Sequence, residues 1–510
     1  MSSPYSIGAL SRKGRNRRGR TGRERSARRP ERSPSGIRGV NGEIRVLRSR
    51  RVKRQKNQLE LAFEPVEQGE ALPPGAEGTE TQRTAHDCRG PARTEFLMEE
   101  ICDPGNLKRA LQRVCQNQGA PGIDGMIIES LPRYLGEHWS QIRTQLLEGS
   151  YRPRAARRIE IPKPGGGVRK LGIPTVLDRL VQQAILQVLQ KRWDPTFSEH
   201  SYGFRPKRDA HQAVARAQEI ITQGYNWVVD IDLEQFFDRV NHDRLMARVA
   251  DRVNDKRLLK LIRAFLNTGI VEDGLVGPTQ EGTPQGSPLS PLLSNLVLDE
   301  LDRELEKRGL PFVRYADDCN IYVRSERAGQ RVMKSVSHFL TRKLRLKVNA
   351  AKSAVARPST RKFLGFSFSE GPNPKRIIAK PAVVRFRCRV VELTGRTRGI
   401  SLPRMVEELT EYLTGWIGYF GFCERRTDLR TLDGWIRRRL RCAAWKQWQT
   451  GRRRYRELLR LGVKAEWAKV TVGSNSGPWL MSSNRAVNQA LSNRYLQSLG
   501  LPTLETWSRA

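Results

Sequence analysis

The sequence has few cysteines and no long apolar run. Its 510 residues include seven cysteines, an odd number, and no C-x-x-C pair, which excludes a zinc module and a full disulfide framework. No run of roughly eighteen apolar residues occurs, and the basic N-terminus lacks the hydrophobic stretch of a signal peptide. A chain of this length can bury several cores without crosslinks. We therefore expect a cytoplasmic protein that does not enter membranes.

Acidic residues are scarce relative to basic ones. The chain has 92 Lys and Arg against 53 Asp and Glu, a formal net charge of +39 at pH 7. Such an excess repels itself, and a polyanionic partner that neutralises it is the economical explanation. Nucleic acid is the obvious candidate. On composition alone, a basic protein that merely adheres to membranes or ribosomes is the alternative.

Composition divides the chain into segments. Residues 1–57 are rich in Arg, Gly and Ser without apolar periodicity, which predicts a disordered basic arm. Residues 58–94 turn to Pro, Gly, Glu and Thr, as linkers do. Helical spacing follows Thr175, a predicted cap. It returns over 402–448, where basic residues and tryptophans predict a separate helical domain that begins near 375.

Carboxylates gather in two segments with alternating apolar residues. In WVVDIDLEQFFDRV, a strand would bury the apolar residues and present Asp230 and Asp232 on its other face. FVRYADDCNIYV predicts two paired strands with Ala316, Asp317 and Asp318 in the turn. Adjacent carboxylates repel each other unless a divalent cation lies between them. The alternative is a pair of solvated turn aspartates, because Asp is a common turn residue.

The two segments resemble the catalytic core of reverse transcriptases. That family's pattern selects as metal ligand the aspartate five residues before an aromatic, here Asp232 before Phe237, and leaves Asp230 as a neighbour. Further blocks narrow the resemblance to the reverse transcriptase/maturase proteins of group II introns, of the bacterial type. These blocks are NLKRALQRVCQNQGAPGIDG (106–125), RRIEIPKPGGGVRKLGIPTVLDRLVQQAI (157–185), FSEHSYGFRPKRDAHQAV (197–214), GTPQGSPLSPLLSN (282–295), LKVNAAKS (346–353) and FLGF (363–366).

The resemblance implies an α+β fold, the right-hand polymerase. Its parts would be a helical N-terminal extension (95–150), fingers and a palm with a ferredoxin-like antiparallel sheet (151–370), a helical thumb/maturase domain (375–450) and a nucleic-acid-binding C-terminal segment (451–510). That last segment has no Cys/His cluster like that of the nuclease domain in longer members. Asp232, Asp317 and Asp318 would be catalytic and hold two Mg²⁺ ions, an arrangement suited to nucleotidyl transfer.

Other side chains receive roles from the same resemblance. Lys163 and Arg169 flank a Gly-rich turn that could close over the incoming triphosphate, although a solvated basic hairpin is the alternative. Gln285 would contact the substrate or primer terminus, and Lys352 would lie near the leaving pyrophosphate as a general acid. Phe237 would exclude a ribose 2′-hydroxyl, unless it is simply a core residue.

The helical domain would contact RNA. Basic residues on one helix would follow a phosphate backbone: Arg437, Arg438, Arg439 and Arg441. Trp435 and Trp445 would anchor that helix or stack on bases, and buried anchoring is favoured for most of the tryptophans.

The resemblance predicts an RNA-directed DNA polymerase that binds its encoding group II intron RNA, assists splicing and copies the intron into DNA at a new site. Its partners would be that RNA, a DNA target and primer, and deoxynucleoside triphosphates; a homodimer is left open. One alternative is a reverse transcriptase recruited to phage defence or CRISPR spacer acquisition, against which the maturase-like segment argues. Intact YADD argues against a splicing cofactor that does not polymerise, and Phe237 argues against an RNA-dependent RNA polymerase.

Overall fold

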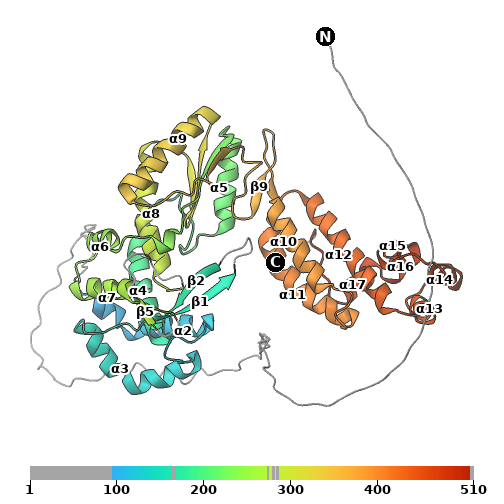
Figure 1. Ribbon diagram of the computed structural model, residues 1–510, viewed down its shortest axis with the longest axis horizontal. Coiled ribbons are helices and arrows are strands. Elements are labelled where there is room, and N and C mark those ends of the chain that lie inside the picture. The colour runs from blue at the N-terminus through green and yellow to red at the C-terminus, as the bar shows by residue number, and fades with distance from the viewer. Residues whose placement is uncertain (1–94, 163–167, 273–274, 278–281, 283–285, 506–510) are drawn as a thin grey trace, which may run out of the picture. The chain divides into compact units, whose positions relative to one another are not determined.

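The computed structural model describes residues 95–162, 168–272, 275–277, 282 and 286–505 (Figure 1). The predicted basic arm (1–57) and linker (58–94) lie outside the described residues, as do Lys163 and Gln285. Among the described residues, we find no helix with the length and hydropathy of a membrane span.

The first described segment is helical and packs against the helix that begins after Thr175. Its elements are α1 (Leu97–Ile101), α2 (Pro104–Asn117), the 3₁₀ turn η2 (Ile128–Ser130) and α3 (Leu131–Leu147). Helix α4 (Val176–Trp193) begins where predicted, because Thr175 Oγ1 accepts the backbone N–H of Asp178 at 3.1 Å. Asn106 joins α2 to α4, since its side-chain amide donates to the carbonyls of Ile101 and Ala184.

The fingers contain a four-stranded sheet in the order β2-β1-β4-β5. Its strands are β1 (Ala156–Pro162), β2 (Val168–Ile173), β4 (Ile270–Glu272) and β5 (Leu275–Gly277). β1 and β2 are antiparallel, with Pro162 opposite Val168, whereas β1 and β4 are parallel. The Gly-rich turn predicted to close over a triphosphate therefore leaves from the ends of β1 and β2.

The palm sheet has the order β6-β7-β3-β8, with every neighbouring pair antiparallel. Its strands are β3 (Trp227–Ile231), β6 (Phe312–Tyr315), β7 (Asp318–Val323) and β8 (Ala354–Ala356). Helix α8 (Ser290–Lys307) precedes β6, and α9 (Glu326–Phe339) connects β7 to β8. This βαββαβ connection and strand order are those of a ferredoxin-like sheet, so the predicted palm fold is confirmed.

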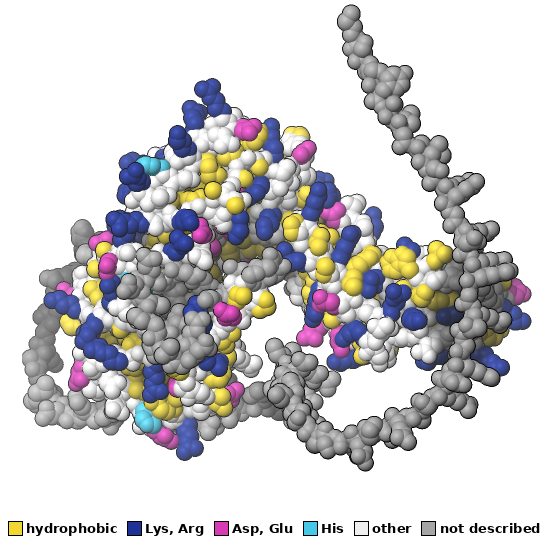
Figure 2. All heavy atoms as spheres, viewed as in Figure 1, with side chains coloured by type: hydrophobic (Ala, Val, Ile, Leu, Met, Phe, Trp, Pro, Cys, Tyr) yellow, Lys and Arg dark blue, Asp and Glu magenta, His cyan; other side chains and the backbone are white. Residues whose placement is uncertain are grey.

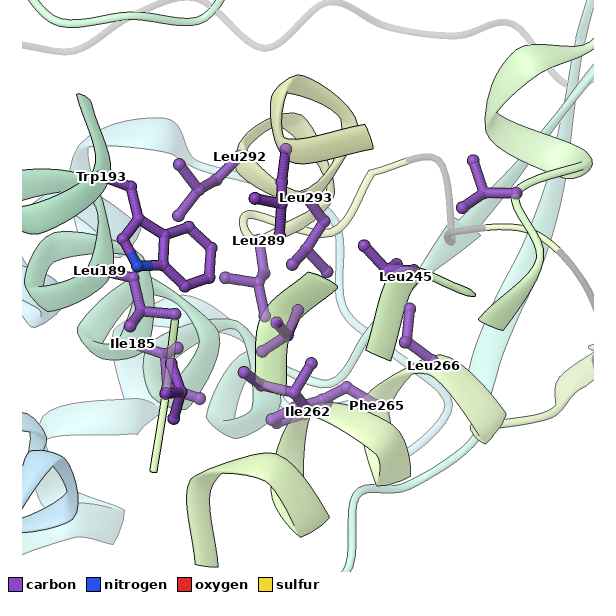
Figure 3. Packing of buried hydrophobic residues seen from close by; sticks show 14 of the residues in the cluster. Ile185, Leu189, Trp193, Leu245, Ile262, Phe265, Leu266, Leu289, Leu292 and Leu293 are labelled. Atoms are coloured by element: carbon purple, nitrogen blue, oxygen red, sulfur yellow. The ribbon is translucent and has the colours of Figure 1, made fainter. Parts of the chain in front are cut away.

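Side chains of β3 alternate between two cores. Val229 and Ile231 belong to the larger core, which they share with α4, α8 and α9. Val228 belongs to a second core, shared with α5 (Ala210–Thr222) and the C-terminal helices. Figure 3 shows part of the larger core, where the Trp193 ring of α4 lies beside Leu289. Asp230 follows Val229 in the strand and therefore points away from the larger core.

Shorter elements complete the palm and its connections. They are η3 (Asp194–Thr196), η4 (Phe236–Asp238), α6 (His242–Ala250), α7 (Lys256–Asn267) and the π-helical turn η5 (Leu340–Leu344). A two-stranded sheet of β9 (Phe366–Phe368) and β10 (Arg376–Ile378) leads into the C-terminal helices.

The C-terminal region is helical throughout its described length. Its helices are α10 (Lys380–Leu393), α11 (Leu402–Phe420), α12 (Arg426–Gln447), α13 (Gly451–Arg460), α14 (Ala465–Val472), α15 (Pro478–Met481), α16 (Arg485–Ala490) and α17 (Asn493–Ser498). Trp416, Trp445 and Trp448 are buried in the second core, while Trp435 is half-buried. Buried anchoring of most tryptophans is therefore confirmed.

Candidate active site

The YADD segment forms a tight hairpin at the end of β6 and β7. Tyr315 pairs with Asp318, so the turn consists of Ala316 and Asp317, and Asp318 opens β7 rather than lying in the turn as predicted. Ala316 has a φ of 58°, a left-handed conformation that residues other than glycine rarely adopt. Contacts from the surrounding structure must therefore hold the turn in place.

Arg314 supports this turn from inside the palm. Its side chain is fully buried, and the guanidinium donates from Nε and Nη2 to the two carboxylate oxygens of Asp302 on α8, at 2.7 and 2.5 Å. Nη1 donates to Asn295 Oδ1 at 2.9 Å and to the Ala316 carbonyl at 3.0 Å. Burial alone would lower the pKa of Arg314, but the Asp302 carboxylate outweighs burial and raises it. The charged guanidinium of Arg314 therefore links the turn to α8 through hydrogen bonds.

Segment 201–203 contacts the same turn from another side. Ser201 forms a parallel bridge with Arg314, and the Tyr202 N–H donates to the Arg314 carbonyl at 2.9 Å. A Cβ atom on Gly203 would lie 2.2 Å from the Ala316 nitrogen, so only glycine fits this backbone contact. The sequence block SYGFRP contains this residue, but the resemblance assigned it no role.

Asp232 lies directly after β3, beside the segment that carries Lys352. Its N–H donates to Ser353 Oγ at 3.0 Å, and its carbonyl accepts from the Asn349 N–H at 2.8 Å. Lys352 Nζ lies 3.8 Å from Asp232 Oδ1. The structure therefore brings Lys352 to one of the three predicted metal ligands.

Asp230 is engaged by Arg361. Arg361 donates from Nε and Nη2 to Asp230 Oδ2, at 2.9 and 2.5 Å, and from Nη2 to the Lys352 carbonyl at 2.7 Å. This pairing occupies Asp230 and holds the backbone of Lys352 next to β3. Arg361 was not singled out from the sequence, because nothing in its local spacing connects it with Asp230.

The carboxylates of the hairpin and of β3 interact electrostatically. Crowding by protein atoms and the charges of Asp317, Asp230 and Asp232 raise the pKa of Asp318 to about 6. Asp318 is nevertheless exposed to solvent, and its carboxylate is repelled by those of its neighbours. A bound cation would remove that repulsion.

The donor chemistry fits Mg²⁺, which prefers carboxylate oxygens. Across the described ranges, however, no three His, Cys, Asp or Glu side chains already form a group that could hold a metal ion. The charges of Asp232 and Asp317 act on the Asp318 carboxyl, yet Asp232 pairs with Lys352. Holding a metal would therefore require Asp232, Asp317 and Asp318 to turn toward one another.

The predicted nucleotide contacts are described only in part. Phe237, in η4, is half-buried, and its ring meets the edge of Phe236 with 5.3 Å between centroids. Phe236 is buried in the larger core, and Phe237 packs against that core while remaining partly exposed, so the role of Phe237 beneath the sugar stays a prediction. The backbone of Arg169 pairs with Ile161 in the fingers sheet. Gly286, which follows Gln285, has a φ of 114°.

The predicted RNA-binding arginines of α12 have partners within the protein. Arg437 is buried and pairs with Asp433 at 3.1 Å, so it does not present its charge to RNA as predicted. This pair, four residues apart, holds α12 to the C-terminal segment, because Asp433 also accepts from the Leu504 N–H. The other three arginines are half-buried. They contact the Trp479 ring (Arg438, 4.2 Å), Thr394 Oγ1 (Arg439, 2.7 Å) and the Leu491 carbonyl (Arg441, 2.9 Å).

Two family profiles match the chain. Residues 161–368 match the reverse transcriptase (RNA-dependent DNA polymerase) family, and residues 383–462 match the maturase-specific domain of group II introns. YkfC of Escherichia coli K12 is 38% identical over 224 residues, 43% of this chain and 59% of YkfC. The group II intron-encoded protein LtrA of Lactococcus lactis is 34% identical over 206 residues, 40% of this chain and 34% of LtrA.

Solved structures resemble the chain only loosely. A chain of a partial Cas6-RT-Cas1–Cas2 complex is 26% identical, with 52% of this chain and 46% of that chain covered at a TM-score of 0.33. Candida albicans telomerase is 13% identical, with 61% and 63% covered at a TM-score of 0.36. Superpositions this loose carry no weight for function.

The ferredoxin-like palm, its YADD hairpin and the first profile define a reverse transcriptase domain. A maturase-specific domain of group II introns follows it, and the chain is similar in this respect to group II intron-encoded proteins. The aligned region spans 59% of YkfC and 34% of LtrA.

Proposed function

We propose that the protein is an RNA-directed DNA polymerase in which Asp232, Asp317 and Asp318 hold two Mg²⁺ ions. The observation that carries this proposal is the pairing of β3 with β7, in which Ile231 lies opposite Cys319, so that Asp232 follows β3 at the end of the palm sheet where the YADD turn carries Asp317 and Asp318. When bound, the metal ions would activate the primer 3′-hydroxyl and stabilise the leaving pyrophosphate.

The surrounding side chains would orient the substrates. The Lys352 ammonium, beside Asp232, would hold a proton for the pyrophosphate, while Arg361 keeps the Lys352 backbone in place. Phe237 would exclude the 2′-hydroxyl of a ribonucleotide. Lys163, Arg169 and Gln285 would contact the incoming deoxynucleoside triphosphate, as the family resemblance implies.

We further propose that the protein binds its encoding group II intron RNA, assists splicing and copies the intron into DNA at a primed DNA target. The maturase-specific match at 383–462, the likeness to LtrA and the net charge of +39 support this role. A role in CRISPR spacer acquisition or phage defence is the second candidate, and the maturase-specific domain favours the intron role over it.

The test compares primer extension on an annealed RNA template with splicing of the intron that flanks the reading frame. Asp317→Ala should abolish extension but still promote splicing, because RNA binding needs basic surface rather than the metal site. Asp251→Ala, at the exposed end of α6, is the matched control and should retain both activities. Normal primer extension by the Asp317→Ala protein with Mg²⁺ would contradict the proposed metal site and polymerase activity. Failure of the unmodified protein to promote splicing would contradict the proposed maturase role.

A further inference from the structure

Helix α9 presents a row of basic side chains to solvent. Arg327, Arg331, Lys334 and Arg342, which we call the α9 stripe, are all exposed. The first three recur at four- and three-residue intervals, and Arg342 follows in η5, so helical spacing places the four on one face. Figure 2 shows Lys and Arg side chains gathered over the part of the molecule formed by α9.

The α9 stripe is not balanced by carboxylates. None of its four side chains has an ion-pair partner among the residues that the structure describes. Exposed arginines at other helices commonly do: Arg133 pairs with Glu137 at 3.0 Å, and Arg425 with Asp428 at 2.9 Å. The α9 stripe is therefore a free positive surface, whereas those sites are already neutralised.

The α9 stripe lies across the palm sheet from the carboxylates. The opposite side of α9 packs on the sheet, since a Cβ on Gly329 would meet side chains of Val355, Val323 and Val229. Val229 and Asp230 are consecutive in β3 and point to opposite faces. A helix layer of roughly 10 Å separates the α9 stripe from the sheet, so phosphates held by the stripe lie on the far side of α9 from the YADD hairpin.

We propose that the α9 stripe binds the phosphate backbone of double-stranded RNA at a site separate from the polymerase cleft, by which we mean the proposed primer–template site at the YADD hairpin. This inference rests on the proposed function, in which the chain binds a structured RNA. Arg327 to Lys334 spans about 10 Å along the helix at roughly 1.5 Å per residue, a length over which a nucleic-acid duplex presents several phosphates. Fixed positive charges at that spacing can each displace a counterion from the RNA.

A membrane surface fits the α9 stripe less well. Helices that lie in a membrane interface bury an apolar face among the lipids. The large exposed apolar residues of the described chain include none from α9, whose apolar residues face the palm sheet. The α9 stripe can therefore hold a polyanion by charge but has no apolar contact to add. With RNA held there, a separate template and primer could occupy the cleft at the same time.

The test uses the full chain with its cleft already filled by a primer–template that ends in a chain terminator, with the next deoxynucleotide and Mg²⁺. The probe is a labelled, fully paired RNA hairpin, titrated over a range of salt concentrations. The test variant is Arg327→Gln/Arg331→Gln/Lys334→Gln. The control is Arg133→Gln/Arg216→Gln/Arg425→Gln, which removes the same charge from arginines already paired with Glu137, Glu219 and Asp428.

The unmodified protein should bind the hairpin with its cleft filled. In the test variant, the slope of log affinity against log salt should flatten by about 2 to 3, because each lost phosphate contact removes roughly 0.7 to 0.9. The control should change the slope by less than about 1, and all three proteins should extend a short primer–template equally. These results would support the proposal.

Three outcomes would overturn the proposal. The first is that filling the cleft abolishes binding of the RNA hairpin by the unmodified protein. The second is that the salt slope of the test variant equals that of the unmodified protein, and the third is that the test variant loses binding to phosphatidylserine vesicles but still binds the RNA hairpin. The proposed function is judged separately, by extension and splicing with the unmodified protein. If those activities are present and the slopes are equal, only the α9 stripe has been misassigned.

Discussion

Replacing Asp302 by Asn should destabilise the palm and slow catalysis through Arg314. Both side chains of this ion pair are fully buried, and Arg314 also holds the Ala316 carbonyl. Asn keeps the size of Asp302 but leaves the guanidinium buried without its counter-charge. Removing one partner of a buried pair costs about 3 to 5 kcal/mol, a large share of a total stability that is typically about 5 to 15 kcal/mol.

The measurement is hydrogen exchange of the β6 and β7 amides, because a chain with several domains need not unfold in one step. A loss of about 3 to 5 kcal/mol corresponds to exchange through opening that is roughly 100 to 5,000 times faster. Asp433→Asn is the matched control, since it breaks the comparably buried pair with Arg437 in α12. It should accelerate exchange in α12 and leave β6 and β7 unchanged.

A double variant distinguishes the effect of Arg314 on the stability of the palm from its effect on the position of the YADD turn. Arg314→Met/Asp302→Leu removes both charges, and such replacements often restore stability. It cannot restore the hydrogen bond to the Ala316 carbonyl, so kcat for extension should stay about 10- to 100-fold low with an unchanged KM for primer–template. If the double variant regains both protection and full kcat, Arg314 does not position the turn.

Three further predictions concern the same site. Gly203→Ala should lower kcat, because its Cβ would collide with the Ala316 nitrogen, whereas Gly434→Ala, with open space around it, should not; equal rates would contradict the contact. Phe237→Val should raise ribonucleotide incorporation about 10- to 100-fold relative to deoxynucleotides in a competition assay; an unchanged ratio would exclude a steric gate. The Mg²⁺ concentration for half-maximal extension should increase as pH falls through about 6, because the raised pKa of Asp318 lets protons compete with the metal; a requirement that is constant across that range would show that Asp318 is not a ligand.

Local sequence patterns predicted the strands and turns of the site better than the contacts that hold them in place. The alternation around Asp230 and Asp232 and the cap at Thr175 are properties of neighbouring residues, and the structure has both. The hairpin was predicted too, but its register was not: the pairing of Tyr315 with Asp318 leaves two residues in the turn. Whether two or three residues form such a turn depends on contacts that bring Arg314 and Gly203 to it.

Contacts between distant segments account for the remaining differences. Arg314 meets Asp302 and Asn295 only because β6 packs against α8, and nothing in their spacing indicates a charged core. Arg437 was assigned to RNA because it lies in a basic run, although Asp433 one helical turn earlier was a signal for an internal pair. Lys352 was placed near the reaction by family resemblance alone.

The catalytic strand β3 is shared by two cores, and this limits how the chain can be shortened. Val228 packs in the core that includes α11 and α12, His211 of α5 donates to the Tyr419 carbonyl at 2.7 Å, and the Tyr419 hydroxyl donates to the Leu364 carbonyl. A fragment ending near residue 375 would expose that apolar face of the palm to water and invite aggregation. The polymerase and maturase portions should therefore be expressed as one piece, and exchanging maturase domains between relatives should succeed only when the residues facing Val228 and His211 are exchanged with them.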